Sequence, residues 1–428
     1  MTSIPDFRSS APGGSPAPVK LAGAQWMVLA AAFLGWMFDG YEQGLFPVVA
    51  RPALRDLLRG AGGDAAIGQW MGIITAAFLV GAALGGLGFG WLGDRIGRVR
   101  AMSASILVYS LVTALAYFAR EPWHLGLVRF LSALGMGGQW ALGVALVMEC
   151  WPEKWRPYLA AAMGAAANCG FLLVSLMAAG HAVTVQSWRW MMLVAAIPAL
   201  LVVFIMGWVP ESGKWKAAVA KAPGTNPLKV IFGAQLAGRT LLGIAFASVA
   251  LIGTWGSVTW LPLWADKMAG DAFPLAKAHT QILQAIGSIV GCVVAPMVGA
   301  RFGRRPAYFL LCAASLTICA LVFHTVHEYG TVFLVYAFFV NAATASFYGW
   351  FPLYLPELFP TRVRATGQGV CYNSGRIFAA VGALTQGQLM EHFGGSYAKA
   401  GSIVTLIYLL GMVLIWLAPE TKGRTLPE

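Results

Sequence analysis

Two carboxylates lie within a stretch of the chain that is otherwise apolar enough to cross a membrane. Asp39 and Glu42 stand three residues apart, so they share one face of a helix. A helix over 25–50 would be about 38 Å long, which spans a bilayer with some tilt and places both acids in its middle third. An ionised group facing lipid there costs about 2.5–3.5 kcal/mol or more, so both acids must face protein or water. Such buried carboxyl groups can exchange protons, which is the chemistry of a proton-coupled membrane protein.

Two arginines fall at comparable depths in other apolar stretches. Counting about 1.5 Å per residue from the expected helix ends places Arg129 within a turn of Glu42, and Arg376 nearer the level of Asp39. Either acid could couple to protons, or one could be a permanent salt-bridge partner of Arg129. We expect Glu42 to be the paired acid and Asp39 the coupling acid. Arg376 could bind a substrate carboxylate through both nitrogens, or pair with Asp39 instead.

Further polar and aromatic side chains are expected near the same level. The candidates for substrate contacts, besides Arg376, are Gln43, Gln139, Trp140, Asn168, Trp255, Asn341, Tyr348 and Asn373. The amides could read substrate hydroxyl groups or could simply bond one helix to another. The tryptophans could supply stacking faces, although aromatic rings are also common packing residues.

The composition indicates a polytopic membrane protein. The chain has 428 residues, of which 58% are hydrophobic and 11% are charged, and its mean hydropathy is +0.70. A soluble domain usually carries about 25% charged residues. Twelve spans are expected, at 25–50, 67–92, 101–118, 124–148, 158–176, 190–208, 240–264, 280–299, 307–323, 331–355, 366–386 and 400–418. We predict an all-α membrane protein, and we expect 51–66 to be a polar outer loop.

The distribution of basic residues predicts the orientation. Nineteen Lys and Arg residues fall in the tails and in the loops on their side, and eight fall in the loops opposite. By the positive-inside rule both termini are cytoplasmic, in a plasma (inner) membrane. The net charge of +12 is thus explained by topology, and no nucleic-acid partner is expected. The expected units are a disordered tail (1–20), a first bundle (21–212), a cytoplasmic central loop (213–239), a second bundle (240–419) and a short tail (420–428).

An internal repeat divides the chain into two halves. The segment 94–98 corresponds to 300–304, the segment 149–156 to 357–364, and the segment 210–212 to 419–421, at nearly one offset. Three matches in the same order indicate two six-helix bundles, an architecture in which the bundles rock about a site at the membrane midplane.

The motifs resemble those of the major facilitator superfamily. The segment Gly90-Trp91-Leu92-Gly93-Asp94-Arg95-Ile96-Gly97-Arg98 looks like the signature between its second and third helices, and the repeat and the Pro-Glu-Ser and Pro-Glu-Thr endings also fit. The resemblance implies twelve transmembrane helices in two bundles. Segments 38–42, 135–140 and 149–152 resemble sialate and related metabolite:proton symporters, with likeness to aromatic-acid:proton symporters and sugar porters. Relatives often carry Glu where Gln139 stands here.

Charged residues at the repeat are expected to form a cytoplasmic gate that holds the two bundles closed on one side. Its expected members are Asp94, Arg98, Glu149, Arg156, Glu211, Arg304, Glu357, Arg364 and Glu420. The alternative is ordinary charge at the membrane interface. Ala300 stands where the second half would carry the counterpart of Asp94, so the gate of that half should be weaker.

These features favour a secondary transporter that works by alternating access. We expect proton-coupled symport of a small organic acid or acidic sugar, by a monomer whose partners are the bilayer, the proton and the substrate. The alternatives are a neutral-sugar:proton symporter, a drug/proton antiporter and a non-transporting membrane sensor. No metal-ligand spacing, nucleotide-binding loop or nucleophile with a suitable base is present, so no enzyme, metal or cofactor is expected.

Overall fold

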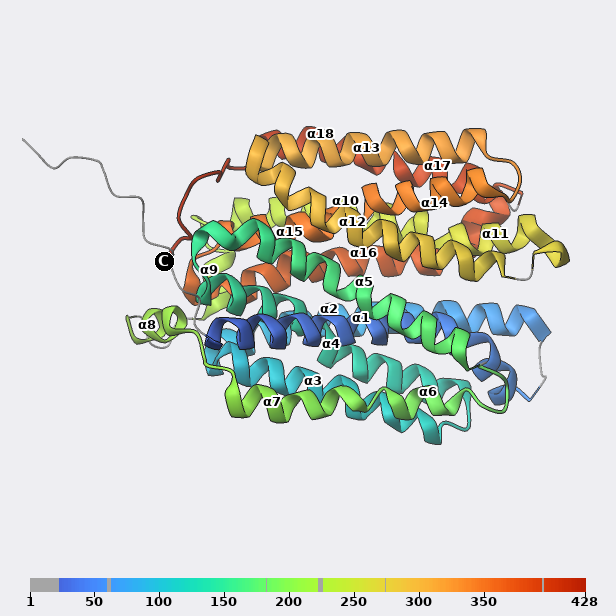
Figure 1. Cartoon of the computed structure of the whole chain (residues 1–428), viewed down its shortest axis with the longest axis horizontal. Helices are drawn as coiled ribbons and strands as arrows, with labels where there is room; N and C mark the ends of the chain where they lie inside the picture. The colour runs from blue at the N-terminus through green and yellow to red at the C-terminus, as the bar shows by residue number, and fades with distance from the viewer. Residues whose placement is uncertain (1–22, 60–62, 182, 222–225, 274, 395) are drawn as a thin grey trace, which may run out of the picture.

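The structure, a computed structural model, describes residues 23–428 except 60–62, 182, 222–225, 274 and 395 (Figure 1). Two helical bundles lie side by side with their long axes nearly parallel. The first bundle contains α1 (Gly23–Leu57), α2 (Gly63–Ile96), α3 (Arg98–Ala114), α4 (Pro122–Cys150), α5 (Arg156–Gly180), α6 (Arg189–Val194) and α7 (Leu201–Trp208). The second contains α10 (Ala237–Gly256), α11 (Leu261–Ala269), α12 (Ala276–Phe302), α13 (Arg304–Thr325), α14 (Thr331–Thr344), α15 (Ser346–Leu358), α16 (Arg364–His392), α17 (Tyr397–Thr405) and α18 (Ile407–Leu414).

The helices supply the twelve expected spans. Four spans are pairs of consecutive helices: α6 with α7, α10 with α11, α14 with α15, and α17 with α18. Ten spans among the described residues are long and apolar enough to cross a membrane. The remaining two are α1 and α16, which are long but interrupted by polar residues. They are the helices that carry Asp39 and Arg376.

Two segments that were expected to be loops are largely helical. The structure continues α1 to Leu57 and begins α2 at Gly63, so the outer loop predicted at 51–66 was too long. The central stretch predicted as a loop at 213–239 holds α8 (Gly213–Lys221) and α9 (Pro227–Ile231), and its last residues begin α10. Helical backbone satisfies its own hydrogen bonds, which favours helix over loop wherever a segment approaches lipid.

The bundles meet along two seams, one between α2 and α16 and the other between α5 and the pair α12 and α15. Small residues allow these close contacts. A Cβ atom added to Gly164 would lie 2.5 Å from the Cα of Gly349 in the other bundle. A Cβ added to Gly86 would lie 1.9 Å from the side-chain nitrogen of Asn373. Both glycines are therefore required for the two halves to approach.

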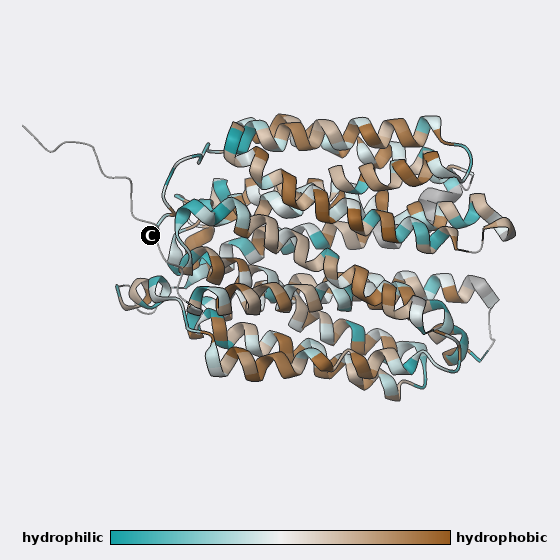
Figure 2. Cartoon of the chain, viewed as in Figure 1, coloured by the Kyte–Doolittle hydropathy of each residue, from teal (hydrophilic) through white to brown (hydrophobic). Residues whose placement is uncertain are grey.

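The polar and apolar residues are arranged as in a membrane-spanning protein. Hydrophilic residues gather at the ends of the helices, and hydrophobic residues follow their middle parts (Figure 2). Large apolar side chains are exposed on the outside, for example Leu84, Val203 and Val413. The C-terminus, α8, α9 and the first residues of α1 lie at one end, which we call the terminal end (Figure 1).

Candidate functional site

Glu42 and Arg129 form a buried ion pair within the first bundle. Nη1 of Arg129 lies 2.5 Å from Oε1 of Glu42, and its Nη2 donates to the backbone carbonyl of Glu42 at 3.1 Å. The hydroxyl of Thr113, from α3, donates to the same carboxylate oxygen. The guanidinium also lies 4.4 Å from the ring centre of Phe78. This is the pairing that the depth count anticipated, and Thr113 is a partner that it missed.

Asp39, one turn earlier on α1, is less fully bonded. The amide of Gln43 donates to its Oδ1 at 2.6 Å. Its Oδ2 is buried and finds no hydrogen-bond partner among the described residues. A buried ionised oxygen without a partner is costly, so Asp39 is better suited than Glu42 to exist without charge.

Arg376 stands on α16, in the second bundle, within Coulombic range of Asp39. The structure gives it no salt bridge to any described carboxylate, so the fixed Asp39–Arg376 pair weighed from the sequence is not formed. Its Nη1 donates to Oδ1 of Asn373 at 3.0 Å, and its guanidinium carbon lies 5.2 Å from the ring centre of Tyr372. The side chain is only 3% exposed. Arg376 is therefore a buried cation that no carboxylate among the described residues contacts directly.

Aromatic rings from both bundles gather around Tyr372, the ring that lies beside this arginine. Tyr372 stacks on Trp140, with ring centres 4.4 Å apart and planes inclined by 21°. Three further rings meet Tyr372 at centre distances of 6.2–6.5 Å: Trp36, Tyr348 and Phe351. Sequence reasoning missed Tyr372, although its position one helical turn before Arg376 was a usable signal.

Uncommitted polar groups also lie in the interior of this region. Neither amide atom of buried Gln139 has a partner among the described residues, and its nitrogen lies so close to Gly35 that a Cβ there would be 2.0 Å away. The buried hydroxyl of Tyr348 also lacks a partner within the described chain. Asn373 is more constrained, because its amide donates to the carbonyl of Gly137 at 3.1 Å and so links the two bundles.

Three of the predicted contact residues do not join this group. Asn168 donates to the sulfur of Cys292 at 3.6 Å, so it links α5 to α12 at the seam. Asn341 accepts from Ser288 at 3.4 Å and links α14 to α12. Trp255 is half-buried in the core of the second bundle, and no ring contact joins it to Tyr372 among the described residues. These hydrogen bonds commit part of each amide to a neighbouring group of the protein.

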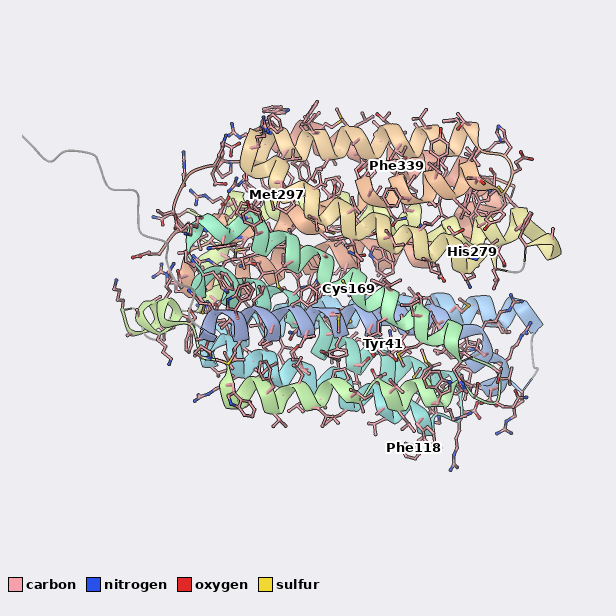
Figure 3. All side chains as sticks on the ribbon, viewed as in Figure 1. Tyr41, Phe118, Cys169, His279, Met297 and Phe339 are labelled. Carbon is pink, nitrogen blue, oxygen red and sulfur yellow. The ribbon has the colours of Figure 1, made fainter. Side chains whose placement is uncertain are left out.

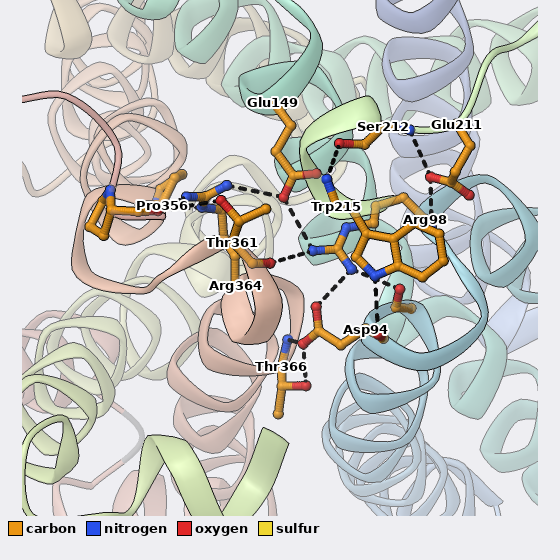
Figure 4. Close-up of polar contacts among 12 residues, drawn as sticks. Asp94, Arg98, Glu149, Glu211, Ser212, Trp215, Pro356, Thr361, Arg364 and Thr366 are labelled. Atoms are coloured by element: carbon orange, nitrogen blue, oxygen red, sulfur yellow. Dashed lines mark hydrogen bonds and ion pairs between the residues drawn. The ribbon is translucent and has the colours of Figure 1, made fainter. Parts of the chain in front are cut away.

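The charged residues at the terminal end connect the bundles directly (Figure 4). Asp94, near the end of α2, pairs with Arg98 at 2.7 Å. Its Oδ2 accepts from the backbone N–H of Thr366 at 2.8 Å and from the Thr366 hydroxyl at 2.5 Å. Thr366 lies in the first turn of α16, so a carboxylate of one bundle caps a helix of the other.

Arg98 and Glu149 extend this contact. Arg98 donates to the backbone carbonyl of Thr361 at 2.8 Å and to Oε1 of Glu149 at 3.2 Å. Arg364 of the second bundle approaches the same Glu149 oxygen at 3.1 Å. We call the group of six residues that makes these contacts the latch. All six are less than 5% exposed: Asp94, Arg98, Glu149, Thr361, Arg364 and Thr366.

Glu211 fixes the start of α3 beside the latch. Its two carboxylate oxygens accept from the backbone N–H groups of Arg98 and Val99 at 3.0 and 3.1 Å. Gly97, just before α3, has φ of 109°, and a Cβ there would lie 2.2 Å from the Glu211 carboxylate. Only glycine fits both requirements.

Glu420 repeats this arrangement at the start of α13. Its oxygens accept from the backbone N–H groups of Arg304 and Arg305 at 2.9 and 3.1 Å. Gly303 has φ of 103°. Burial alone would raise the pKa of Glu420, but the backbone hydrogen bonds, including two from Thr421 and Lys422, outweigh it and lower that pKa below the ordinary value.

The second half does not reproduce the contacts between bundles. Arg304 binds Glu357 of its own bundle through two nitrogens, at 2.9 and 2.6 Å, and the Thr421 hydroxyl adds a third contact to that carboxylate at 2.6 Å. Ala300 offers no carboxylate to the first bundle. The ion pair between the bundles, Glu149 with Arg364, therefore uses the glutamate of the first half of the repeat. This agrees with the expectation, based on Ala300, that the gate of the second half is weaker.

Arg156 departs from the arrangement expected of a gate residue. By the repeat it corresponds to Arg364, yet it pairs with Glu153 at 2.6 Å, three residues earlier in its own chain segment. Its Nη1 donates to the carbonyl of Arg424 in the C-terminal tail at 3.1 Å.

Trp215 of α8, which sequence reasoning missed, contacts the latch by donating to the carbonyl of Asp94 at 3.0 Å.

Figure 3 draws the side chains of the described residues, and in it Tyr41 marks the interior of the first bundle and Cys169 its seam with the second. The model of the Major Facilitator Superfamily matches residues 24–383. The chain is 28% identical over 348 residues to the cis,cis-muconate transport protein of Acinetobacter baylyi, covering 79% of this chain and 82% of that protein.

It is also 26% identical over 397 residues to the sialic acid transporter NanX of Escherichia coli, covering 92% and 93% of the two chains. Among solved structures, the proton:xylose symporter XylE bound to 6-bromo-6-deoxy-D-glucose superposes with a TM-score of 0.75 at 21% identity, over 94% of this chain and 98% of that one. Two bundles of six spans, the repeated motifs and these matches agree: the chain is a multi-pass membrane transporter that belongs to the major facilitator superfamily.

Proposed function

We propose that the protein is a proton-coupled symporter of small organic acids. The observation that carries this proposal is Arg376, a buried guanidinium at the meeting of the two bundles to which no carboxylate of the described part of the chain is bound. A substrate carboxylate supplies the missing partner and can accept two parallel hydrogen bonds. Breaking or forming that contact is sensitive to the relative position of the bundles, as alternating access requires.

Asp39 is the proton-coupling acid in this proposal. Ionised Asp39 lies within Coulombic range of Arg376 and would repel an incoming carboxylate while attracting the same guanidinium. Protonation removes both effects, so the proton and the acid bind together. Glu42 and Arg129 remain a charged structural pair throughout the cycle, because neither can lose its charge without leaving the other buried and unpaired.

The rings favour a flat substrate. Trp140 and Tyr372, from different bundles, stack on one another beside Arg376, so a planar substrate that inserted between them as the bundles move would gain two stacking faces. The muconate and sialic acid relatives have names that point to a planar unsaturated acid and to an acidic sugar, respectively. We favour the planar acid; the unpartnered amide of Gln139, which could bond a hydroxyl group, is the feature that would serve an acidic sugar.

The latch defines the state of the transporter in this proposal. We assign the terminal end to the cytoplasm of the cell, because the basic residues of the chain concentrate in the loops and tails on that side. The latch then closes the cytoplasmic entrance, and its breakage accompanies rocking to the inward-facing state. The protein would lie in the plasma membrane with both termini in the cytoplasm.

Uptake by purified protein in liposomes tests the proposal. An inward proton gradient should drive accumulation of cis,cis-muconate or benzoate in preference to sialic acid and xylose. Arg376→Gln should abolish this accumulation, whereas Arg376→Lys should retain part of it at a higher KM because one charge remains without the planar fork. Xylose uptake that survives in Arg376→Gln would identify a neutral-sugar carrier instead, and preference for sialic acid would identify an acidic-sugar carrier.

A further inference from the structure

A second candidate site lies at the terminal end, away from the Arg376 region. A cavity of about 420 Å³ opens between the end of α9, the start of α10 and the turn that follows α15. Its lining residues are Val230, Gly233, Ala234, Gln235, Leu236, Arg239, Pro360, Arg362 and Pro427. This volume is large enough for a small polar group.

The cavity is bordered by two arginines for which the described part of the chain supplies no salt bridge. Arg239 and Arg362 are both exposed, and within the described part of the chain neither forms a salt bridge. Arg239 donates a long hydrogen bond, 3.5 Å from its Nη1 to the carbonyl oxygen of Leu358. Four other arginines at this end are each paired with a carboxylate: Arg98, Arg156, Arg304 and Arg364. The cavity therefore offers two guanidinium groups to an anion.

Apolar side chains beside the cavity place it at the membrane surface. Leu228 on α9, Phe232 just after it and Leu241 on α10 are 38%, 51% and 59% exposed. Exposed apolar side chains at the end of a membrane-spanning bundle are suited to contact the acyl chains of lipids. An occupant of the cavity would thus have a charged group between the arginines and apolar chains alongside.

We infer that this cavity, which we call the α9–α10 pocket, binds the phosphate headgroup of an anionic phospholipid. Two guanidinium groups match the oxygens of a phosphodiester, and basic pockets at the membrane surface of transporters are suited to anionic headgroups. The acyl chains follow Phe232 and Leu241 into the bilayer. The orientation proposed above assigns this lipid to the cytoplasmic leaflet.

The pocket also shares a wall with the contacts that close the terminal end. The carbonyl of Pro427 accepts from Nη2 of Arg364 at 2.7 Å and from the hydroxyl of Thr361 at 3.3 Å. Through the carbonyl of Arg424, the same tail segment is bonded to Arg156 of the first bundle. Lipid in the pocket therefore contacts a segment that bridges the bundles, and it stabilises the closed arrangement to the extent that opening displaces Pro427.

Delipidated full-length protein in detergent tests the inference. Phosphatidylglycerol, phosphatidylcholine and inorganic phosphate are added separately, and binding is followed by the melting temperature and by native mass spectrometry. We expect phosphatidylglycerol to raise the melting temperature of the wild type more than phosphatidylcholine does. The Arg239→Gln/Arg362→Gln variant should require about 30-fold more phosphatidylglycerol, at about 1 kcal/mol for each basic residue removed.

Lys216→Gln/Lys221→Gln is the matched control, because it removes two exposed charges from α8 at the same end without touching the pocket lining. It should bind phosphatidylglycerol within about twofold of the wild type. Equal losses in the two double variants would show diffuse attraction and overturn the inference, as would undiminished binding by the arginine variant. If inorganic phosphate alone raises the melting temperature as much as phosphatidylglycerol does, the pocket binds a free anion and the inference of a lipid ligand is overturned. If the double variant does not fold, Arg362→Gln alone should give about a fivefold loss.

Discussion

Asp94 accepts two hydrogen bonds from Thr366, one from its backbone N–H and one from its hydroxyl, although the two residues belong to different bundles. The bond to the N–H satisfies one of the free donors at the start of α16, and the negative charge stands at the positive end of that helix. Both interactions are lost when the bundles separate at this end. If the bundles rock as proposed, the contact would therefore stabilise the state in which this end is closed, rather than the fold as a whole.

Asp94→Asn should weaken the latch while leaving membrane insertion intact. Hydrogen bonds to charged groups contribute about 1.5–3 kcal/mol, so the population of closed molecules relative to open ones should fall about tenfold or more. Spin labels at the exposed positions Arg100 and Arg362 would report a longer distance, and transport should decrease. Arg95→Gln, at an exposed neighbouring position, is the control. Normal uptake by Asp94→Asn at normal expression would show that the latch does not matter for transport.

The two acids of α1 should respond differently to neutralisation. Glu42→Gln leaves Arg129 buried without a charged partner, which should lower the free energy of unfolding by about 3–5 kcal/mol. Asp39→Asn removes no ion pair, so the melting temperature should change little, but accumulation driven by a proton gradient should be lost while substrate exchange continues. Thermal unfolding in detergent and counterflow in liposomes measure these effects. The assignment is reversed if Glu42→Gln uncouples transport and Asp39→Asn does not.

Gly97→Ala should destabilise the protein by about 1–3 kcal/mol. The new Cβ would meet the Glu211 carboxylate at 2.2 Å while the backbone holds φ at 109°. Gly303→Ala should cost less, because the corresponding distance to Glu420 is 2.8 Å. Gly88→Ala is the matched control: Gly88 lies inside α2 with open space around it, and alanine there should be neutral or stabilising. Melting temperatures of the three variants should follow this order.

Glu420 should make the stability of the second bundle dependent on acid pH. Because its pKa is lowered in the folded protein, the cap stabilises the fold above the ordinary glutamate pKa, and this contribution disappears as the pH falls through the lowered value. Glu420→Gln should therefore melt below the wild type at neutral pH, and the difference should shrink below about pH 4. A difference that is constant from pH 7 to pH 3 would exclude the ionised cap as its source.

The architecture was predictable because it depends on two patterns that can be read directly from the sequence, the long apolar segments and the internal repeat. Apolar segments long enough to cross a membrane indicated the spans, and the repeat of Asp94–Arg98 at 300–304 indicated two halves. The outer loop at 51–66 was drawn too long, because charged residues after Ala50 suggested a loop. Hydropathy does not reveal that a polar helix continues beyond the membrane.

For the candidate site, the sequence predicted how deep each side chain lies along its helix, but not which side chains it contacts. Counting residues placed Glu42 near Arg129, but a depth count does not give rotation about a helix axis. Asn341 and Asn168 therefore fell at plausible heights, yet they bond neighbouring helices. Trp215 was missed because aromatic residues are frequent in this chain and only its contact with Asp94 distinguishes it. Tyr372 could have been found from its position one helical turn before Arg376.

The interior charges also set the electrical character of the proposed cycle. Glu42 and Arg129 cancel one another, and ionised Asp39 balances Arg376, so the empty carrier holds no net charge in its central region. Adding one proton and one monocarboxylate leaves that balance at zero. The change between outward-facing and inward-facing states then moves no charge across the membrane, whether the carrier is loaded or empty. Transport of one proton with one monocarboxylate would therefore be driven by the pH difference and would not depend on the membrane voltage. Clamping the voltage with potassium and valinomycin should leave uptake of the monocarboxylate benzoate unchanged, whereas cis,cis-muconate, with two carboxylates, would carry a net negative charge with one proton and its uptake should respond to the voltage.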